Sequence, residues 1–356
     1  MQVHRLTLLA AALMLPTLGM ADDGVRIYGR VDIGPIYESN PTGDSNFRID
    51  EVSGNRLGFI GTETLSKDLW AFYRLEHRFH LDDGTERSGR HGGTQFWTDK
   101  AWVGIGSKTY GALSAGRILT VGNSIVGGGD TEAMTDSIGA TNSRKGRIEN
   151  NLDNGLFYES PWFQPGKGMK LRVKAHYALA EVDGIQNPYG LGVQWRSGKF
   201  LLDTGYQHDV YKDGSDPSKE DRKSNSWFTG AGYDFDSFEL KGTFATSRGY
   251  EGDVSDHSPY RMKTAQVSLN KDFGPWRLGV MIGRKTETST SGTKQPNLDK
   301  VAVGYWYNFS KNTMLMPTIA YERKSGSAYK AGSNGFGEDK DKSGNLYLQL
   351  GLRHEF

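Results

Sequence analysis

Hydrophobic and polar residues alternate strictly along the last stretch of the chain, residues 346–356. Leucines occupy every second position, and the residues between them are Tyr347, Gln349, Gly351 and Arg353. A period of two places successive side chains on opposite faces of a β-strand. In an open sheet this last strand would leave an exposed edge, which invites aggregation, whereas closing the sheet into a barrel removes the edge. The pattern predicts a barrel-closing strand with its leucines toward lipid and its polar residues toward a wet interior.

Similar alternating segments of about ten residues, the length of a tilted transmembrane strand, recur through the chain. The first runs over about 24–37, a second lies between a polar loop and residue 61, and the fourth is expected over about 96–106. Short turns alternate with long polar loops between the segments, and the tally is sixteen strands. We therefore predict an all-β fold, a sixteen-stranded antiparallel transmembrane β-barrel.

One segment interrupts this regular order. Residues 118–151 show no alternation and contain three consecutive glycines at 127–129. Loops of this length are rare, and they are usually functional or disordered. This third long loop is the first candidate for a functional segment.

Composition narrows the class of protein. The chain is polar, with a mean hydropathy of −0.59 and 47 glycines, and no apolar run in its mature part is long enough for a membrane helix, which needs about 20 residues. It has no cysteine, which excludes disulfides, thiolate metal sites and thiol nucleophiles.

The N-terminus has the features of a secretory signal peptide. Arg5 gives a basic start, an apolar core follows, and small residues around Ala21 form a cleavage site. We expect a signal peptide over 1–21 and the barrel over 22–356. The mature chain would then carry equal numbers of basic and acidic residues, and nothing suggests a nucleic-acid partner.

Motifs for enzymatic or metal chemistry are weak. Residues 104–109 (GIGSKT) superficially resemble a phosphate loop, but the glycine spacing is wrong and a turn is expected. The histidines are scattered without ligand spacing, and no G-x-S-x-G elbow is present. We expect no catalytic residues, no metal and no cofactor.

Eight segments, in order, resemble the Gram-negative trimeric porins, in particular the subgroup shared with neisserial and other proteobacterial porins. They are RIYGRVDIG (26–34), SGNRLGFIG (53–61), YRLE (73–76), AWVGIG (101–106), GALSAGR (111–117), YESP (158–161), VGYWYNFSKNT (303–313) and GLRHEF (351–356). The resemblance implies a homotrimer of aqueous barrels in outer-membrane lipid. It also implies that the third long loop folds inward and that its acids face basic residues on the barrel wall.

The basic wall positions come partly from the resemblance and partly from periodicity. Arg30 matches the basic residue of the first-strand motif, Arg56 the one before LGF, and Lys100 the one before the fourth-strand motif. Arg74 and Arg78 share the inward parity of the third strand.

One position of the basic wall departs from the family pattern, because Asn151 stands where the subgroup often has arginine. Arg144, Lys145 or Arg147 is the expected substitute, and Arg147 is included in the predicted wall. The loop acids are expected to be Asp130, Glu132 and Asp136, with Glu149 a weaker candidate.

Opposed acids and bases across a constriction create a transverse field that discriminates solutes by charge. The expected function is passive diffusion of ions and small hydrophilic solutes, with a substrate-preferring channel, selective for anions or small metabolites, as the alternative. Because the wall bases outnumber the loop acids, we expect a weak preference for anions. Two further alternatives are an outer-membrane barrel enzyme and a soluble secreted β-sandwich or lectin. The sequence offers no paired Ser and His for such an enzyme.

Overall fold

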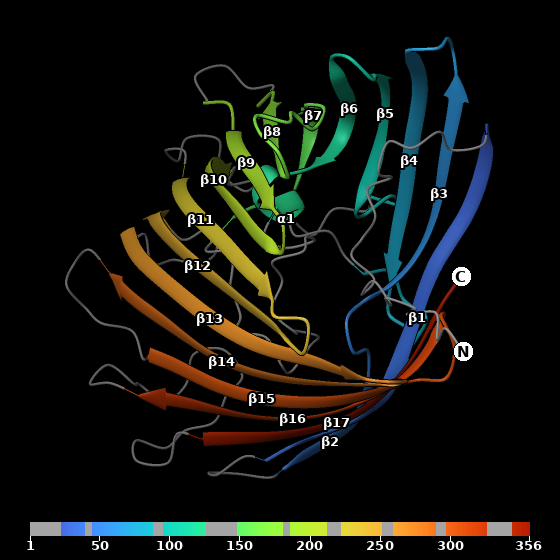
Figure 1. The fold of residues 1–356 in the computed structure, drawn as a ribbon. Helices are drawn as coiled ribbons and strands as arrows, with labels where there is room; N and C mark the ends of the chain where they lie inside the picture. Colours follow the sequence, from blue (N-terminus) through green and yellow to red (C-terminus); the bar gives the residue numbers. More distant parts are fainter. Residues whose placement is uncertain are drawn as a thin grey trace.

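The alternating segments form one closed antiparallel β-sheet (Figure 1). The computed structural model describes residues 23–39, 45–87, 95–125, 148–180, 186–211, 222–250, 259–289, 297–325 and 344–356. Within these ranges no helix is long and apolar enough to cross a bilayer.

The strands follow one another around the wall in chain order. The first group comprises β1 (Gly24–Glu38), β2 (Asn46–Asp50), β3 (Asn55–Thr64), β4 (Leu69–Phe79), β5 (Lys100–Ser107) and β6 (Gly111–Leu119), followed by the short helix α1 (Val121–Ile125). The second group comprises β7 (Asn151–Glu159), β8 (Met169–Ala178), β9 (Tyr189–Ser197), β10 (Phe200–Tyr211), β11 (Arg222–Asp234) and β12 (Glu239–Tyr250). The last group comprises β13 (Pro259–Phe273), β14 (Trp276–Ser289), β15 (Asn297–Asn308), β16 (Thr313–Ser325) and β17 (Gly344–Glu355).

Two of these strands, β2 and β3, share one place in the wall. Both pair with β1, β2 alongside its second half and β3 alongside its first half. The strand is interrupted between them, where the Asp32 carboxylate accepts hydrogen bonds from the backbone N–H groups of Val52 (2.8 Å) and Ser53 (3.0 Å). With β2 and β3 counted as one barrel strand, the barrel has sixteen strands, which confirms the predicted fold class.

The barrel closes between its first and last strands. β1 pairs with β17 from Arg30 opposite Glu355 to Glu38 opposite Tyr347. Beyond this ladder, Gly29 and Phe356 exchange two backbone hydrogen bonds of 2.9 and 3.1 Å. A Cβ at position 29 would lie 2.3 Å from the Phe356 ring, so glycine is needed for the ring to cover this position. The predicted closing strand is confirmed.

Alternation along each strand separates an outer from an inner face. On β17 the leucines at 346–352 face outward with 37–50% of their surface exposed, while Gln349 and Arg353 are 5% exposed on the inner face. On β5, Val103 and Ile105 face outward and are 62% and 50% exposed, whereas Lys100, 1% exposed, points inward. The predicted polarity of the wall, apolar outside and polar inside, therefore holds on these strands.

Residues 96–99, expected at the start of the fourth strand, do not form strand, and β5 begins only at Lys100. The Phe96 ring instead stacks on His77, with ring centroids 4.6 Å apart. The Thr98 carbonyl accepts hydrogen bonds of 2.9–3.0 Å from the guanidinium of Arg117, and not from a neighbouring strand. These side-chain contacts take the place of strand pairing over residues 96–98, and Asp99, which follows, lies beside the inner wall in contact with Arg78.

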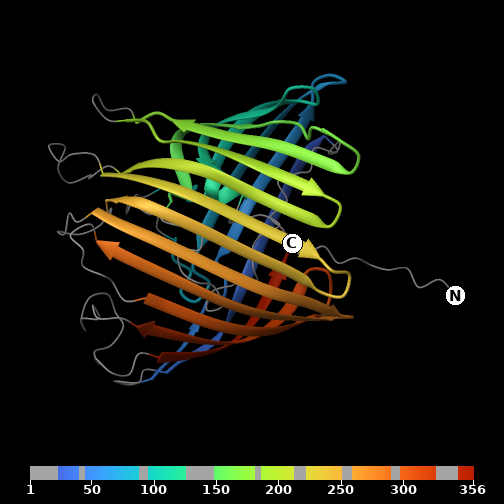
Figure 2. The same ribbon diagram turned by 60° about the vertical axis from the view of Figure 1, so that its left-hand side comes forward.

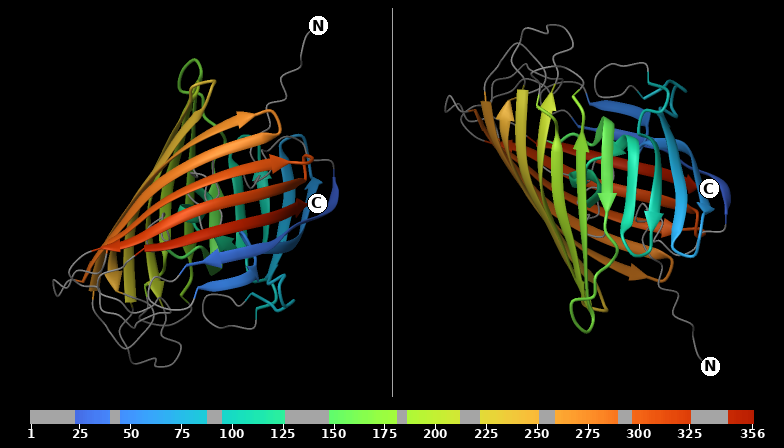
Figure 3. Two further views of the ribbon diagram at one scale, coloured as in Figure 1. Left: turned by 90° about the horizontal axis from the view of Figure 1, so that it is seen from below. Right: turned by 90° about the horizontal axis from the view of Figure 1, so that it is seen from above.

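Strands run obliquely around the wall, as the side views show (Figures 2 and 3). Short turns, such as Gly198-Lys199 between β9 and β10, join the strands at one end of the barrel. Near these turns aromatic rings meet in pairs, including Trp276 and Tyr305 at 4.4 Å. Amphipathic rings in such a belt suit the interface between lipid and water.

Candidate functional site

Five of the predicted wall bases lie on the inner face of neighbouring strands. Arg30 of β1, Arg56 of β3 and Arg78 of β4 are direct cross-strand partners, so they form one row across three strands. On β4, Arg74 lies two inward-facing positions nearer the short turns than Arg78, and Lys100 of β5 is the cross-strand partner of Glu76, which lies between them. Strand register therefore gathers these bases into one patch of the inner wall, which periodicity alone could not establish.

Glu76 lies at the centre of this cluster and is fully buried. Its carboxylate is 2.7 Å from Lys100 Nζ, 3.2 Å from Arg74 Nη2 and 3.3 Å from Arg78 Nη2, and it accepts the Tyr28 hydroxyl at 2.7 Å. Like-charged side chains at this spacing repel one another unless an acid stands between them. Glu76 has the inward parity of Arg74 and Arg78, but sequence reasoning did not select it as a site residue.

Asp99 is a second acid of the cluster that sequence reasoning missed. Its carboxylate pairs with Lys100 and lies 3.2 Å from Arg78 Nη2. The Asn151 side-chain amide donates to the Asp99 carbonyl. Position 151, where the family resemblance led us to expect arginine, therefore carries a neutral amide, and this amide binds the backbone carbonyl of Asp99.

Arg30 belongs to a polar network at the barrel seam. Its guanidinium lies 2.8 Å from Glu355 and 3.1 Å from the Ser53 hydroxyl. Arg353 of the last strand pairs with Asp32 at 3.3 Å and shares Ser53 with Arg30. These contacts join β1 to β17 through side chains as well as through the backbone.

Arg56 is the base with the weakest compensation. Its closest acid is Glu76, 3.8 Å away, and its Nε and Nη1 atoms have no hydrogen-bond partner among the described residues. Among the described residues, the five bases are in contact with three acids, Glu76, Asp99 and Glu355. Arg353 and Asp32 balance each other. The cluster therefore carries an excess of two positive charges.

Both ends of the third long loop leave β6 and β7 and lie along the inner wall of β8–β10. Helix α1 contacts β8, β9 and β10 and lies inside the ring of strands (Figure 1). Val121 and Ile125 pack over Gly192, where a Cβ would lie 2.2 Å from Ile125. Gln207 accepts the Gly122 N–H at 3.1 Å and donates to the Glu149 carbonyl at 3.0 Å, so one side chain holds both ends.

The remaining site predictions fall on the middle of that loop. The predicted loop acids and the candidate substitutes for the missing arginine lie outside the described residues; they are Asp130, Glu132, Asp136, Arg144, Lys145 and Arg147. Glu149 is described and is 5% exposed, and its backbone N–H donates to Asp209.

The family model described as Gram-negative porin matches residues 6–327 of this chain. The chain belongs to the Gram-negative porin family. Porins are outer-membrane channels for passive diffusion and are not enzymes, so the protein is a channel of the outer membrane.

Known proteins from other bacteria resemble this porin along nearly its whole length. An outer-membrane porin of Bordetella pertussis is 24% identical over 98% of this chain and 99% of its own length. The major outer membrane protein P.IB of Neisseria sicca is also 24% identical, covering 96% of this chain and 97% of that protein.

Solved porin structures share the fold of this porin. The anion-selective porin from Comamonas acidovorans superposes with a TM-score of 0.70 at 18% identity, covering 94% of this chain and 99% of that one. OmpF of Salmonella typhi, in complex with daunomycin, gives a TM-score of 0.65 at 16% identity, with 93% and 97% covered. The trimer form of OmpT from Vibrio cholerae gives 0.64 at 17%, with 94% and 99% covered.

A second charged group of this porin lies on the inner face of β7–β10. Glu159 accepts from Arg172 (2.6 Å) and Lys174 (3.0 Å), and Asp203 pairs with Arg196 at 2.5 Å. Trp162 lies under Arg172, with the guanidinium carbon 4.4 Å from the ring centroid. Among the described residues, three bases of this group face two acids, so its excess is one positive charge against two in the group around Glu76.

Proposed function

We propose that the cluster around Glu76 is the positively charged side of the pore constriction and that it gives this porin a preference for anions. The observation that carries the proposal is the excess of two positive charges among described side chains gathered in one patch of the inner wall. In a narrow pore with low-dielectric walls, such a charge raises the local concentration of counter-ions.

The opposite side of the constriction is proposed to come from the third long loop. Its two ends are held on the inner wall of β8–β10, which supports an inward course for the segment between them. Asp130, Glu132 and Asp136 would then face Arg30, Arg56, Arg74, Arg78 and Lys100, with Arg147 completing the wall.

The reversal potential of the reconstituted channel in a potassium chloride gradient tests the charge preference. We expect its sign to report anions as the more permeant ions. A cation-selective reversal potential would refute the proposed role of the cluster while leaving the channel assignment intact.

A substrate-preferring channel is the second candidate function. The similarity to the anion-selective porin from Comamonas acidovorans favours a preference for anions over equal passage of all small solutes. Titrating organic anions of equal charge and increasing size into the bilayer chamber distinguishes the two, because a substrate-preferring channel is blocked by some of them and not by others.

We further propose that the protein is exported with a cleavable signal over 1–21 and assembles as a homotrimer in outer-membrane lipid. The trimer form of OmpT shares the fold, which supports this assembly. N-terminal sequencing of the membrane-extracted protein should begin at Asp22, and light scattering of the detergent complex should give three protein chains per particle. A different first residue would reject the cleavage site, and one chain per particle would reject the trimer.

A further inference from the structure

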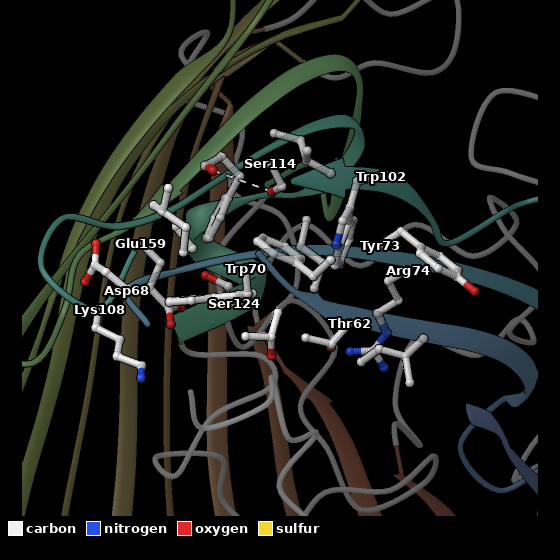
Figure 4. A pocket seen from close by; sticks show the side chains of 18 of the residues that line it. Thr62, Asp68, Trp70, Tyr73, Arg74, Trp102, Lys108, Ser114, Ser124 and Glu159 are labelled. Carbon is white, nitrogen blue, oxygen red and sulfur yellow. Dashed lines mark hydrogen bonds between the residues drawn. The ribbon is translucent and has the colours of Figure 1, made fainter. Parts of the chain in front are cut away.

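A cavity of about 310 Å³ lies on the inner wall between the Glu76 cluster and the short turns (Figure 4). It is bounded by β3–β7 on one side and by Ser124 of α1 on the other. Its volume is near the lower end of the range for small-molecule sites, which suits a solute of one or two rings.

Aromatic side chains dominate the lining of this cavity, although the inner wall of a water-filled channel is otherwise polar. Trp70 and Phe72 of β4, Trp102 of β5 and Phe157 of β7 all contribute to it. Phe157 also packs against the buried cluster of Val121, Ile125, Phe228 and Ala245, so the cavity is continuous with the packing of α1.

Two glycines of β5 allow the aromatic rings to lie flat on the wall. A Cβ at Gly106 would lie 2.0 Å from the Trp70 ring, and one at Gly104 would lie 2.5 Å from the Phe72 ring. The rings are therefore held in place by the neighbouring strand before any solute arrives. A rigid, preformed apolar surface binds a flat solute with little loss of conformational freedom.

Charges at the edge of the cavity favour an anionic partner. The acids that line it are Glu159, which is paired with Arg172 and Lys174, and Asp68, which accepts the hydroxyl of Ser107 at 2.6 Å and keeps its single negative charge. In contrast, Lys67 and Lys108 line the same cavity and form no ion pair within the described part of the chain.

We propose that this cavity is a binding subsite for small aromatic carboxylates, with the ring against Trp70, Phe72 and Trp102 and the carboxylate toward Lys67 and Lys108. Aromatic rings attract one another in offset or edge-on arrangements, and a carboxylate is attracted by the two ammonium groups. This proposal rests on the proposed anion preference. It adds the class of anion that would be retained on the short-turn side of the constriction.

Single-channel recordings with sodium benzoate as the probe test the subsite without any mutation. We expect benzoate to produce resolved blockades of the current that sodium acetate at equal concentration does not, and benzylammonium chloride to block more weakly than benzoate. Equal effects of benzoate and acetate would overturn the aromatic part of the proposal. Equal or stronger block by benzylammonium would overturn the anionic part.

A matched pair of variants locates the site. Trp102→Leu should weaken the benzoate block about 3- to 10-fold. Trp306→Leu removes an indole from the inner face of β15, outside the cavity, and should leave the block unchanged. If both variants lose the block equally, or neither does, the cavity is not the site.

Two further readouts separate failure of the subsite from failure of the channel. Unblocked conductance and the reversal potential in potassium chloride report the pore and its charge preference independently of benzoate. Quenching of tryptophan fluorescence by benzoate in detergent solution reports binding for any variant that folds but inserts poorly into the bilayer, and we expect quenching for Trp306→Leu and a several-fold weaker effect for Trp102→Leu.

Discussion

Strands β4 and β13 lie on opposite sides of the barrel and have contrasting inner faces (Figure 1). The inner face of β4 carries Arg74, Glu76 and Arg78. The inner face of β13 is uncharged from Met262 to Asn270, through Thr264, Gln266 and Ser268.

Both faces are polar enough for a wet interior, so hydration of the wall does not require the charges of β4. Their concentration on one side creates a field across the pore that a symmetric wall would lack. If the charges of β4 serve selectivity, as we propose, the neutral wall of β13 can be varied at little cost.

The largest effect is expected from Glu76→Gln, which removes the acid that separates four bases. Breaking a buried ion pair by removing one partner costs about 3–5 kcal/mol. We expect a loss of that order in the free energy of unfolding, measured by denaturant titration of tryptophan fluorescence.

On the neutral wall, Gln266→Leu provides the control and should change the free energy of unfolding by less. Equal losses for the two variants would show that Glu76 does not act as the hub of the basic cluster.

The next largest effect is expected from Gln207→Leu, because this side chain holds both ends of the third long loop. Leaving its buried backbone partners without hydrogen bonds costs about 1–3 kcal/mol per group. We expect increased noise of the open-channel current as the loop ends loosen.

The same substitution at Gln349 serves as control. This residue is equally enclosed on the inner face of β17, and its side-chain amide has no hydrogen-bond partner among the described residues. Matching noise in the two variants would argue against a role of Gln207 in holding the loop.

A smaller effect, on selectivity more than on stability, is expected from Arg56→Gln. Removing one poorly compensated charge changes the energy of a nearby ion by about 1 kcal/mol in a water-filled pore. The ratio of anion to cation permeability should fall about two- to fivefold, as measured by reversal potential.

Since like-charged neighbours surround Arg56, the folded state should lose little stability in this variant. Thr264→Val on β13 should leave the reversal potential unchanged. A shift in Thr264→Val as large as that in Arg56→Gln would remove the distinction between the two walls.

The smallest effect is expected from Ser226→Ala on β11, two strands from β13, whose inner face is likewise uncharged from Ser224 to Gly230. It removes a hydroxyl pair with Ser247 at 2.7 Å. A neutral hydrogen bond contributes about 0.5–1.5 kcal/mol, so the free energy of unfolding should fall by no more than this and the selectivity should not change. A measurable shift in reversal potential would contradict the view that this wall is electrically passive.

Much of the fold could be predicted because period-two alternation is a local property of the sequence. It indicated the closing strand before Phe356 and the inward parity of Arg74 and Arg78. It did not indicate the start of β5, because the contacts that replace strand pairing over residues 96–98 come from His77 and Arg117, which are distant in sequence.

The site was predicted less completely, since parity gives the face of a residue but not its height. The row of Arg30, Arg56 and Arg78 depends on the register of three strands. Glu76 and Asp99 could be recognised only once that register had placed bases around them. An acid between two inward bases, as in R-L-E-H-R at 74–78, is a signal that could have identified Glu76.

Closure through Phe356 has a consequence for how the protein is made. The side chains of Arg30 and Glu355, which meet at the seam, are separated by 325 positions in the sequence. The first strand therefore has no partner on one side until the final residues have been synthesised and exported, so the wall can be sealed only after the whole polypeptide has reached the membrane. Until then, a binding factor that shields strand edges would protect both unsealed margins from pairing with other chains.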